Sequence, residues 1–160
     1  MANLTGQRQI FSGDTSVIDT SATAPALSRA MDEVGNEYVY LAGVASTVTG
    51  KCVTFTPTGS TVILAADAIG PVAVAMNYNV SPSNWSWYQV YGKATASVAD
   101  ATTGAVISLF ISGTTGYLGI TDVAGDVVVG AFYMSGTSTG GTAAVTVWLN
   151  NPIVTNIAIN

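Results

Sequence analysis

The stretch Gly70–Val98, GPVAVAMNYNVSPSNWSWYQVYGKATASV, sets the fold of this 160-residue chain. Its first part, Pro71–Asn77, alternates Val and Met with Ala and Asn, which is typical of a half-buried β-strand. The run 79–84, with its Pro and Asn residues, predicts a loop. Trp85–Tyr91 then places aromatic side chains on both of its faces. The stretch therefore predicts the centre of a β-sheet rather than a catalytic loop.

A glycine and a second alternating segment follow the aromatic residues. Gly92 predicts a tight bend or a β-bulge, because glycine accepts backbone conformations that other residues avoid. In the next segment, Lys93–Val98, we expect Ala94, Ala96 and Val98 to face the core.

Short apolar segments with Gly-containing turns between them continue along the rest of the chain. Strands at intervals of about 8–12 residues, without a long amphipathic helix, indicate an all-β fold, which we expect to be a single compact β-barrel or β-sandwich domain. Asn151-Pro152 is expected to end the last regular strand, and Ile153–Asn160 is apolar enough to add one edge strand or to pair with a neighbouring chain. The other expected strands are Glu37–Leu41, Lys51–Thr56, Thr61–Leu64, Val106–Ile111, Tyr117–Thr121, Val127–Met134 and Ala143–Leu149.

The first 35 residues differ from the remainder. Thr15–Leu27 is small and polar and has no sustained period, which indicates an extended or partly ordered N-terminal arm. A short helical turn is expected around Pro25–Asp32. The domain organisation that follows is an arm at residues 1–35 and a β-rich domain at residues 36–160.

Composition restricts the function. Hydrophobic residues make up 49% of the chain and charged residues only 8%, against about 25% charged in an ordinary globular protein. The net charge of −5, with four cationic residues, argues against nucleic-acid binding, which needs clustered cations. The chain has no uninterrupted run of about 18 apolar residues, which is the pattern that would predict a membrane span. Such a weakly charged surface suits a protein that packs against neighbouring chains.

The side chains for most catalytic and metal chemistry are missing. The chain has no histidine, so histidine-based acid–base catalysis and histidine metal sites are excluded. Asp122 and Asp126 flank a turn and are conceivable calcium ligands, but turn carboxylates are commoner and the spacing fits no EF-hand loop. The single cysteine, Cys52, lies in an apolar segment and is expected to be a buried thiol. We therefore expect no catalytic residues, no cofactor and no metal.

Large aromatic and cationic side chains are the candidates for an interface. Trp148 falls on the face of its strand opposite Val145, Val147 and Leu149, and a tryptophan on a non-core face often anchors a contact, although a loop or the arm would cover it equally well. The candidate interface residues are Arg8, Phe11, Arg29, Trp85, Trp87, Tyr88 and Trp148.

Several of these segments together resemble head decoration, or cement, proteins of tailed bacteriophages. The resemblance spans most of residues 32–152. It implies a small β-rich virion protein on the capsid surface, often a trimer, that binds the major capsid protein of the assembled capsid and stabilises it, with the arm contacting capsid subunits. The segments that carry it are Asp32–Ala42 (DEVGNEYVYLA), Gly50–Thr56 (GKCVTFT), Gly70–Ala75 (GPVAVA), Trp87–Ala96 (WYQVYGKATA), Val128–Phe132 (VVGAF) and Val145–Pro152.

Two other functions remain open on the sequence. A carbohydrate-binding module would use Trp85, Trp87 and Tyr88 as a stacking platform and would need them exposed in a row. A subunit of a tail, fibre or surface-layer assembly would share the chemistry of a decoration protein but bind a different partner.

Overall fold

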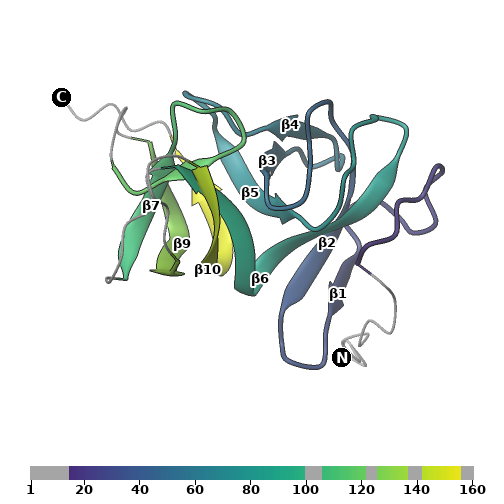
Figure 1. Cartoon of the computed structure of the whole chain (residues 1–160). Helices are drawn as coiled ribbons and strands as arrows, with labels where there is room; N and C mark the ends of the chain where they lie inside the picture. Colours follow the sequence, from purple (N-terminus) through teal and green to yellow (C-terminus); the bar gives the residue numbers. More distant parts are fainter. Residues whose placement is uncertain (1–14, 100–105, 122–125, 137–141, 156–160) are drawn as a thin grey trace, which may run out of the picture.

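The computed structural model describes residues 15–99, 106–121, 126–136 and 142–155. This part of the chain consists of β-strands and connections and contains no helix, so the predicted all-β class is confirmed (Figure 1). The strands are β1 (Arg29–Met31), β2 (Glu37–Ala42), β3 (Cys52–Phe55), β4 (Thr61–Ile63), β5 (Gly70–Ala75), β6 (Trp85–Ala99), β7 (Ile107–Ile111), β8 (Leu118–Gly119), β9 (Val127–Ser135) and β10 (Thr142–Val154).

All ten strands belong to one sheet with the order β1-β2-β6-β8-β7-β9-β10-β5-β3-β4, and β6 also pairs with β10 and with β5. The pairings β6–β8, β8–β7, β7–β9, β9–β10 and β10–β6 return to their starting strand, so this half of the molecule closes as in a β-barrel. Figure 1 shows this half beside the half that is built from β1 to β5.

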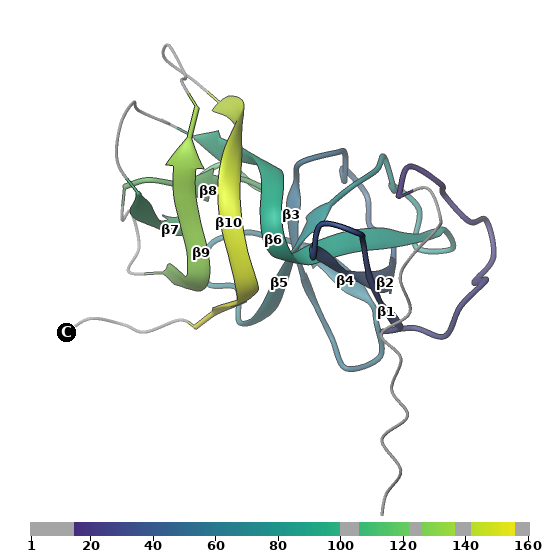
Figure 2. The same ribbon diagram turned by 90° about the horizontal axis from the view of Figure 1, so that it is seen from below.

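The long strand β6 connects the two halves (Figure 2). Its first half pairs with β2 and β5, and its second half pairs with β10 and β8. The sequence predicts two strands here, but the structure has one continuous strand of 15 residues. Gly92 lies within it at a φ of 91°, so it supplies the expected bend without ending the strand.

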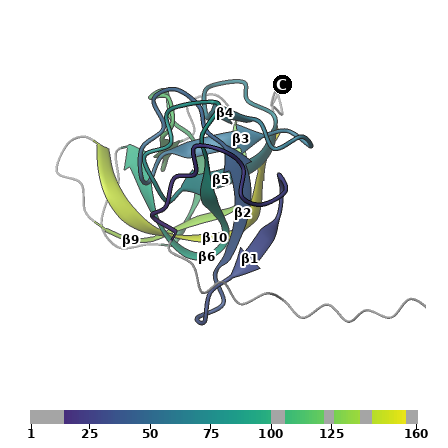
Figure 3. The same ribbon diagram turned by 90° about the vertical axis from the view of Figure 1, so that its right-hand side faces the viewer.

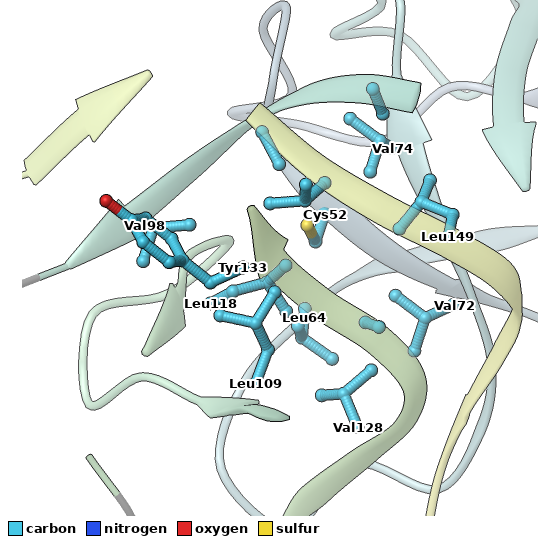
Figure 4. Packing of buried hydrophobic residues seen from close by; sticks show 14 of the residues in the cluster. Cys52, Leu64, Val72, Val74, Val98, Leu109, Leu118, Val128, Tyr133 and Leu149 are labelled. Atoms are coloured by element: carbon cyan, nitrogen blue, oxygen red, sulfur yellow. The ribbon is translucent and has the colours of Figure 1, made fainter. Parts of the chain in front are cut away.

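Two apolar clusters lie on the two sides of β5. Val72 and Val74 belong to the larger cluster, while Ala73 and Ala75 belong to the smaller one. The prediction of a half-buried strand is therefore wrong for β5, because Val72–Ala75 are buried whichever face they point to. Figure 3 shows β5 in the middle of the molecule, among the other strands. The larger cluster is shown in Figure 4, where Cys52 lies among branched side chains from several strands.

The region assigned to the arm is partly built into the sheet. Asp19 forms a β-bridge with Trp85 at the start of β6, and β1 pairs with β2, so residues 29–31 are part of the sheet. The expected helical turn at Pro25–Asp32 is wrong: a turn with Leu27 at a φ of 66° leads directly into β1. Residues 1–14, with Arg8 and Phe11, lie outside the described residues.

The expected end of the last strand at Asn151-Pro152 is also wrong, because β10 continues to Val154. A register shift accommodates these two residues, and Asn151 takes a φ of 44°, which asparagine tolerates better than most residues. Ile153 and Val154 then pair with both β9 and β5. The rest of the expected edge strand, residues 156–160, lies outside the described residues.

Candidate interaction surface

The outer face of β9 and β10 carries large apolar side chains that no described element covers (Figure 2). This exposed surface follows from the alternation of side chains along each strand. The larger cluster receives Ala131, Tyr133, Val147 and Leu149, so the residues next to them point outward. We call this surface the β9–β10 face. Its apolar members are between 37% and 52% exposed and are Val129, Phe132, Met134, Trp148 and Ile153.

The apolar side chains of the β9–β10 face lie opposite one another across the two strands. Phe132 is the register partner of Trp148, and Val129 is the partner of Ile153. On its other side, Trp148 is opposite Lys93 of β6. A contiguous exposed apolar surface of this kind marks an interaction site more often than scattered exposed residues do. The structure thus places the candidate residue Trp148 within an apolar surface, beside Lys93.

A groove adjoins this face beside the bend of β6, between the turn that joins β1 to β2 and Trp148 of β10. Its volume is about 610 Å³. The ring of Tyr91 meets the ring of Trp148 edge to face, with centroids 5.9 Å apart, and the Asn36 side chain accepts a hydrogen bond from the Lys93 backbone N–H at 3.0 Å. The lining residues are Met31, Val34, Gly35, Asn36, Tyr91, Gly92, Lys93 and Trp148.

Arg29, a second candidate, ties the edge strand β1 to β10. Its guanidinium donates a hydrogen bond to Asn151 Oδ1 at 2.9 Å and lies 3.8 Å from the Glu37 carboxylate. Because half of this side chain is exposed, the ion pair contributes at most about 1 kcal/mol. Arg29 is thus a structural bridge in the free chain.

The other three aromatic candidates lie away from the β9–β10 face. Tyr88 is completely buried, and burial raises its pKa to about 12, although Asn79 donates a hydrogen bond of 3.0 Å to its hydroxyl. Trp85 and Trp87 are half-buried and pack on Tyr40, with ring centroids 5.7 Å and 5.1 Å apart. The three residues therefore do not form the exposed row that a sugar-stacking platform needs.

Residues 15–28, which we call the strap, pair through their backbone with Trp85 of β6 and Tyr40 of β2. Asp19 and Trp85 exchange two backbone hydrogen bonds of 2.8 Å, and the Ser86 hydroxyl donates to the Val17 carbonyl at 3.1 Å. The Tyr40 hydroxyl donates to the Asp19 carboxylate. Burial and this hydrogen bond both raise the pKa of Tyr40 above its ordinary value. The strap is thus fastened to β2 and to the start of β6.

Replacing Tyr40 by Phe is expected to loosen the strap, because the phenol that donates to Asp19 and accepts from the Thr23 N–H disappears. A hydrogen bond to a charged group contributes about 1.5–3 kcal/mol. We expect urea denaturation to show a loss of this size and acrylamide to quench tryptophan fluorescence more strongly in the variant. The control is Tyr78→Phe, whose ring is exposed. Equal quenching in Tyr40→Phe and the unsubstituted protein would contradict a strap over Trp85.

The cysteine and the aspartates considered for catalysis or metal binding are buried or lie outside the described residues. Cys52 is fully buried, and burial raises the pKa of its thiol to about 12, so the reactive thiolate is scarce at neutral pH. Asp126 is buried and accepts a hydrogen bond from the Asp67 N–H at 3.1 Å, while Asp122 lies outside the described residues. In the part that the structure describes, no three His, Cys, Asp or Glu side chains are grouped to hold a metal, and no helix is long and apolar enough to cross a bilayer.

Sequence reasoning did not select the residues that complete the groove. Asn36 and Lys93 come from segments far apart in the chain and are joined by one hydrogen bond. No local pattern signals this contact. The alternation of Trp148 with its core-facing neighbours was the sequence signal that pointed to the β9–β10 face.

Comparison with known proteins identifies no relative of this chain, because no family model, no curated protein and no solved structure matches it.

Proposed function

We propose that this chain is a structural virion protein that binds the outside of an assembled phage capsid and stabilises it, with the major capsid protein as its partner. The observation that carries the proposal is the β9–β10 face, where two cross-strand apolar pairs, Phe132–Trp148 and Val129–Ile153, are exposed to solvent. Apolar burial contributes about 25 cal/mol per Å², and protein interfaces place such side chains at their centre.

The low charge of the chain supports the same proposal. With 8% charged residues and a net charge of −5, the surface suits apolar contact more than electrostatic recognition of a polyanion. In this proposal the protein is located on the capsid surface, acts without a cofactor and without catalysis, and forms a homo-oligomer, for which the resemblance favours a trimer. Residues 1–14, with Arg8 and Phe11, would add contacts to capsid subunits.

The alternatives are distinguished by the partner. A tail, fibre or surface-layer subunit would use the same β9–β10 face against a different protein. The carbohydrate-binding alternative finds no support in the positions of Trp85, Trp87 and Tyr88, since Tyr88 is buried and the strap crosses Trp85.

Co-sedimentation with purified expanded heads of the phage that encodes the chain tests the proposal. We expect the protein to pellet with heads and the double variant Phe132→Thr/Trp148→Thr to bind at least tenfold more weakly, because the two largest apolar contacts are lost. Val62→Thr is the matched control, since Val62 is exposed on β4, away from this face.

Deletion of residues 1–14 tests the first part of the arm independently of the β9–β10 face, because the deletion leaves the strap and β1 in the chain. Weaker binding to heads than that of the full-length protein would show that residues 1–14 contact capsid subunits. Heads that leave the full-length protein in the supernatant, at concentrations where it is folded, would overturn the proposed function.

A further inference from the structure

The groove beside the β9–β10 face combines apolar walls with one available cation. Of the three cationic side chains in the described residues, Arg29 is bound to Asn151, and Lys51 donates to the Thr115 carbonyl and lies over the Tyr117 ring. Lys93 is exposed and its ammonium group has no hydrogen bond or ion pair in the described part of the chain. The groove therefore offers a positive charge on a protein that is negative overall.

The side chain of Asn36 in the groove is already used. Asn36 accepts the Lys93 N–H with its Oδ1 and donates with its Nδ2 to the Asp32 carboxylate at 2.7 Å. The complementary ligand is a peptide segment with an acidic side chain next to an apolar one, where the acid meets Lys93 and the apolar group meets Trp148.

The chain itself carries such a segment at the turn between β1 and β2. Glu33 is exposed there without an ion pair in the described residues, and the adjacent Val34 is 83% exposed, the highest value among the large apolar residues that the structure describes. The two side chains thus present a carboxylate and an isopropyl group side by side to solvent.

The turn is held in one conformation by the Asp32 carboxylate. It accepts hydrogen bonds from the backbone N–H groups of Val34 and Asn36, at 3.0 Å and 2.8 Å, and from the Tyr38 hydroxyl at 2.9 Å. Partial burial opposes ionisation, but these bonds and the Asn36 side chain outweigh it and hold the pKa of Asp32 below its ordinary value. A preformed segment loses little entropy on docking.

We infer that the groove receives the β1–β2 turn of a second copy of this chain, with Glu33 of one copy paired to Lys93 of the other and Val34 packed against Trp148. Because the turn itself forms one wall of the groove, each copy offers both halves of the contact, and repeating this heterologous contact from copy to copy would close a ring such as a trimer. The inference concerns the protein alone and does not depend on the capsid partner.

Charge reversal tests this inference on the purified protein by sedimentation equilibrium at low salt. We expect reversible self-association, weakened at least tenfold by Glu33→Lys and by Lys93→Glu, and restored to within a few-fold of the original dissociation constant when both substitutions are combined. High salt is expected to weaken the association of the unsubstituted protein, because the ion pair is screened.

The apolar half of the contact has its own variant and control. Val34→Asp is expected to weaken association at least tenfold, whereas Ile69→Asp, at a residue that is 72% exposed in another loop, is expected to leave it unchanged. Both sites are exposed, so circular dichroism should show folded variants. A protein that stays monomeric up to millimolar concentration, single reversals that associate normally, or a double variant that fails to recover would each overturn the inference.

Discussion

Replacing Gly92 by Ala is expected to lower the free energy of unfolding by about 3–6 kcal/mol, the sum of backbone strain, overpacking and a lost hydrogen bond. Gly92 has a φ of 91°, which strains any residue with a Cβ. The added Cβ would also overlap Asn36 Oδ1 and lie 3.1 Å from Asn36 Cα. Asn36 would have to move and release the Lys93 N–H that it binds. The bend that joins the two halves of the sheet would then lose its support.

Urea denaturation measures the free energy of unfolding that Gly92→Ala loses, with Gly35→Ala as the control variant. Gly35 has a nearly identical φ of 90°, but nothing lies within 4 Å of its added Cβ. The control therefore isolates backbone strain and is expected to cost about 1–2 kcal/mol. Equal losses in the two variants would show that the contact with Asn36 contributes nothing to the stability of the bend.

Leu149→Ala is expected to destabilise the protein by about 2–5 kcal/mol, as large-to-small core substitutions do. Leu149 is 1% exposed and packs in the larger cluster with residues from several strands, among them Val72 and Val128 (Figure 4). Its neighbours belong to a closed ring of strands and cannot collapse freely into the space, so a cavity remains. Thermal and urea unfolding both report this loss.

Ile153→Ala on the same strand is the control for Leu149→Ala. Ile153 points outward on the β9–β10 face, so its truncation is expected to cost less than about 1 kcal/mol. A comparable loss at both positions would mean that Ile153 is covered in solution. A negligible loss at Leu149 would contradict its place in the core.

The local pattern of residues was enough to predict most strands and the inward face of many of them. Alternation is a local property of period two, so it assigns Ala94, Ala96 and Val98 on β6 to the core and Trp148 to an outward position without any long-range contact. The glycines between segments likewise marked the bend at Gly92, because the need for a positive φ is local too. The absence of histidine removed whole classes of chemistry whatever the fold.

Which strands lie together, and what each face meets, depended on contacts between distant parts of the chain. Burial of both faces of β5 required a second apolar cluster, in which Val39 and Leu41 of β2 pack with Tyr88 of β6. The groove depends on a hydrogen bond between Asn36 and Lys93, 57 residues apart. Such contacts arise from the pairing of distant strands, which a local pattern does not encode, so the groove and its fit to the β1–β2 turn exist only in the closed sheet.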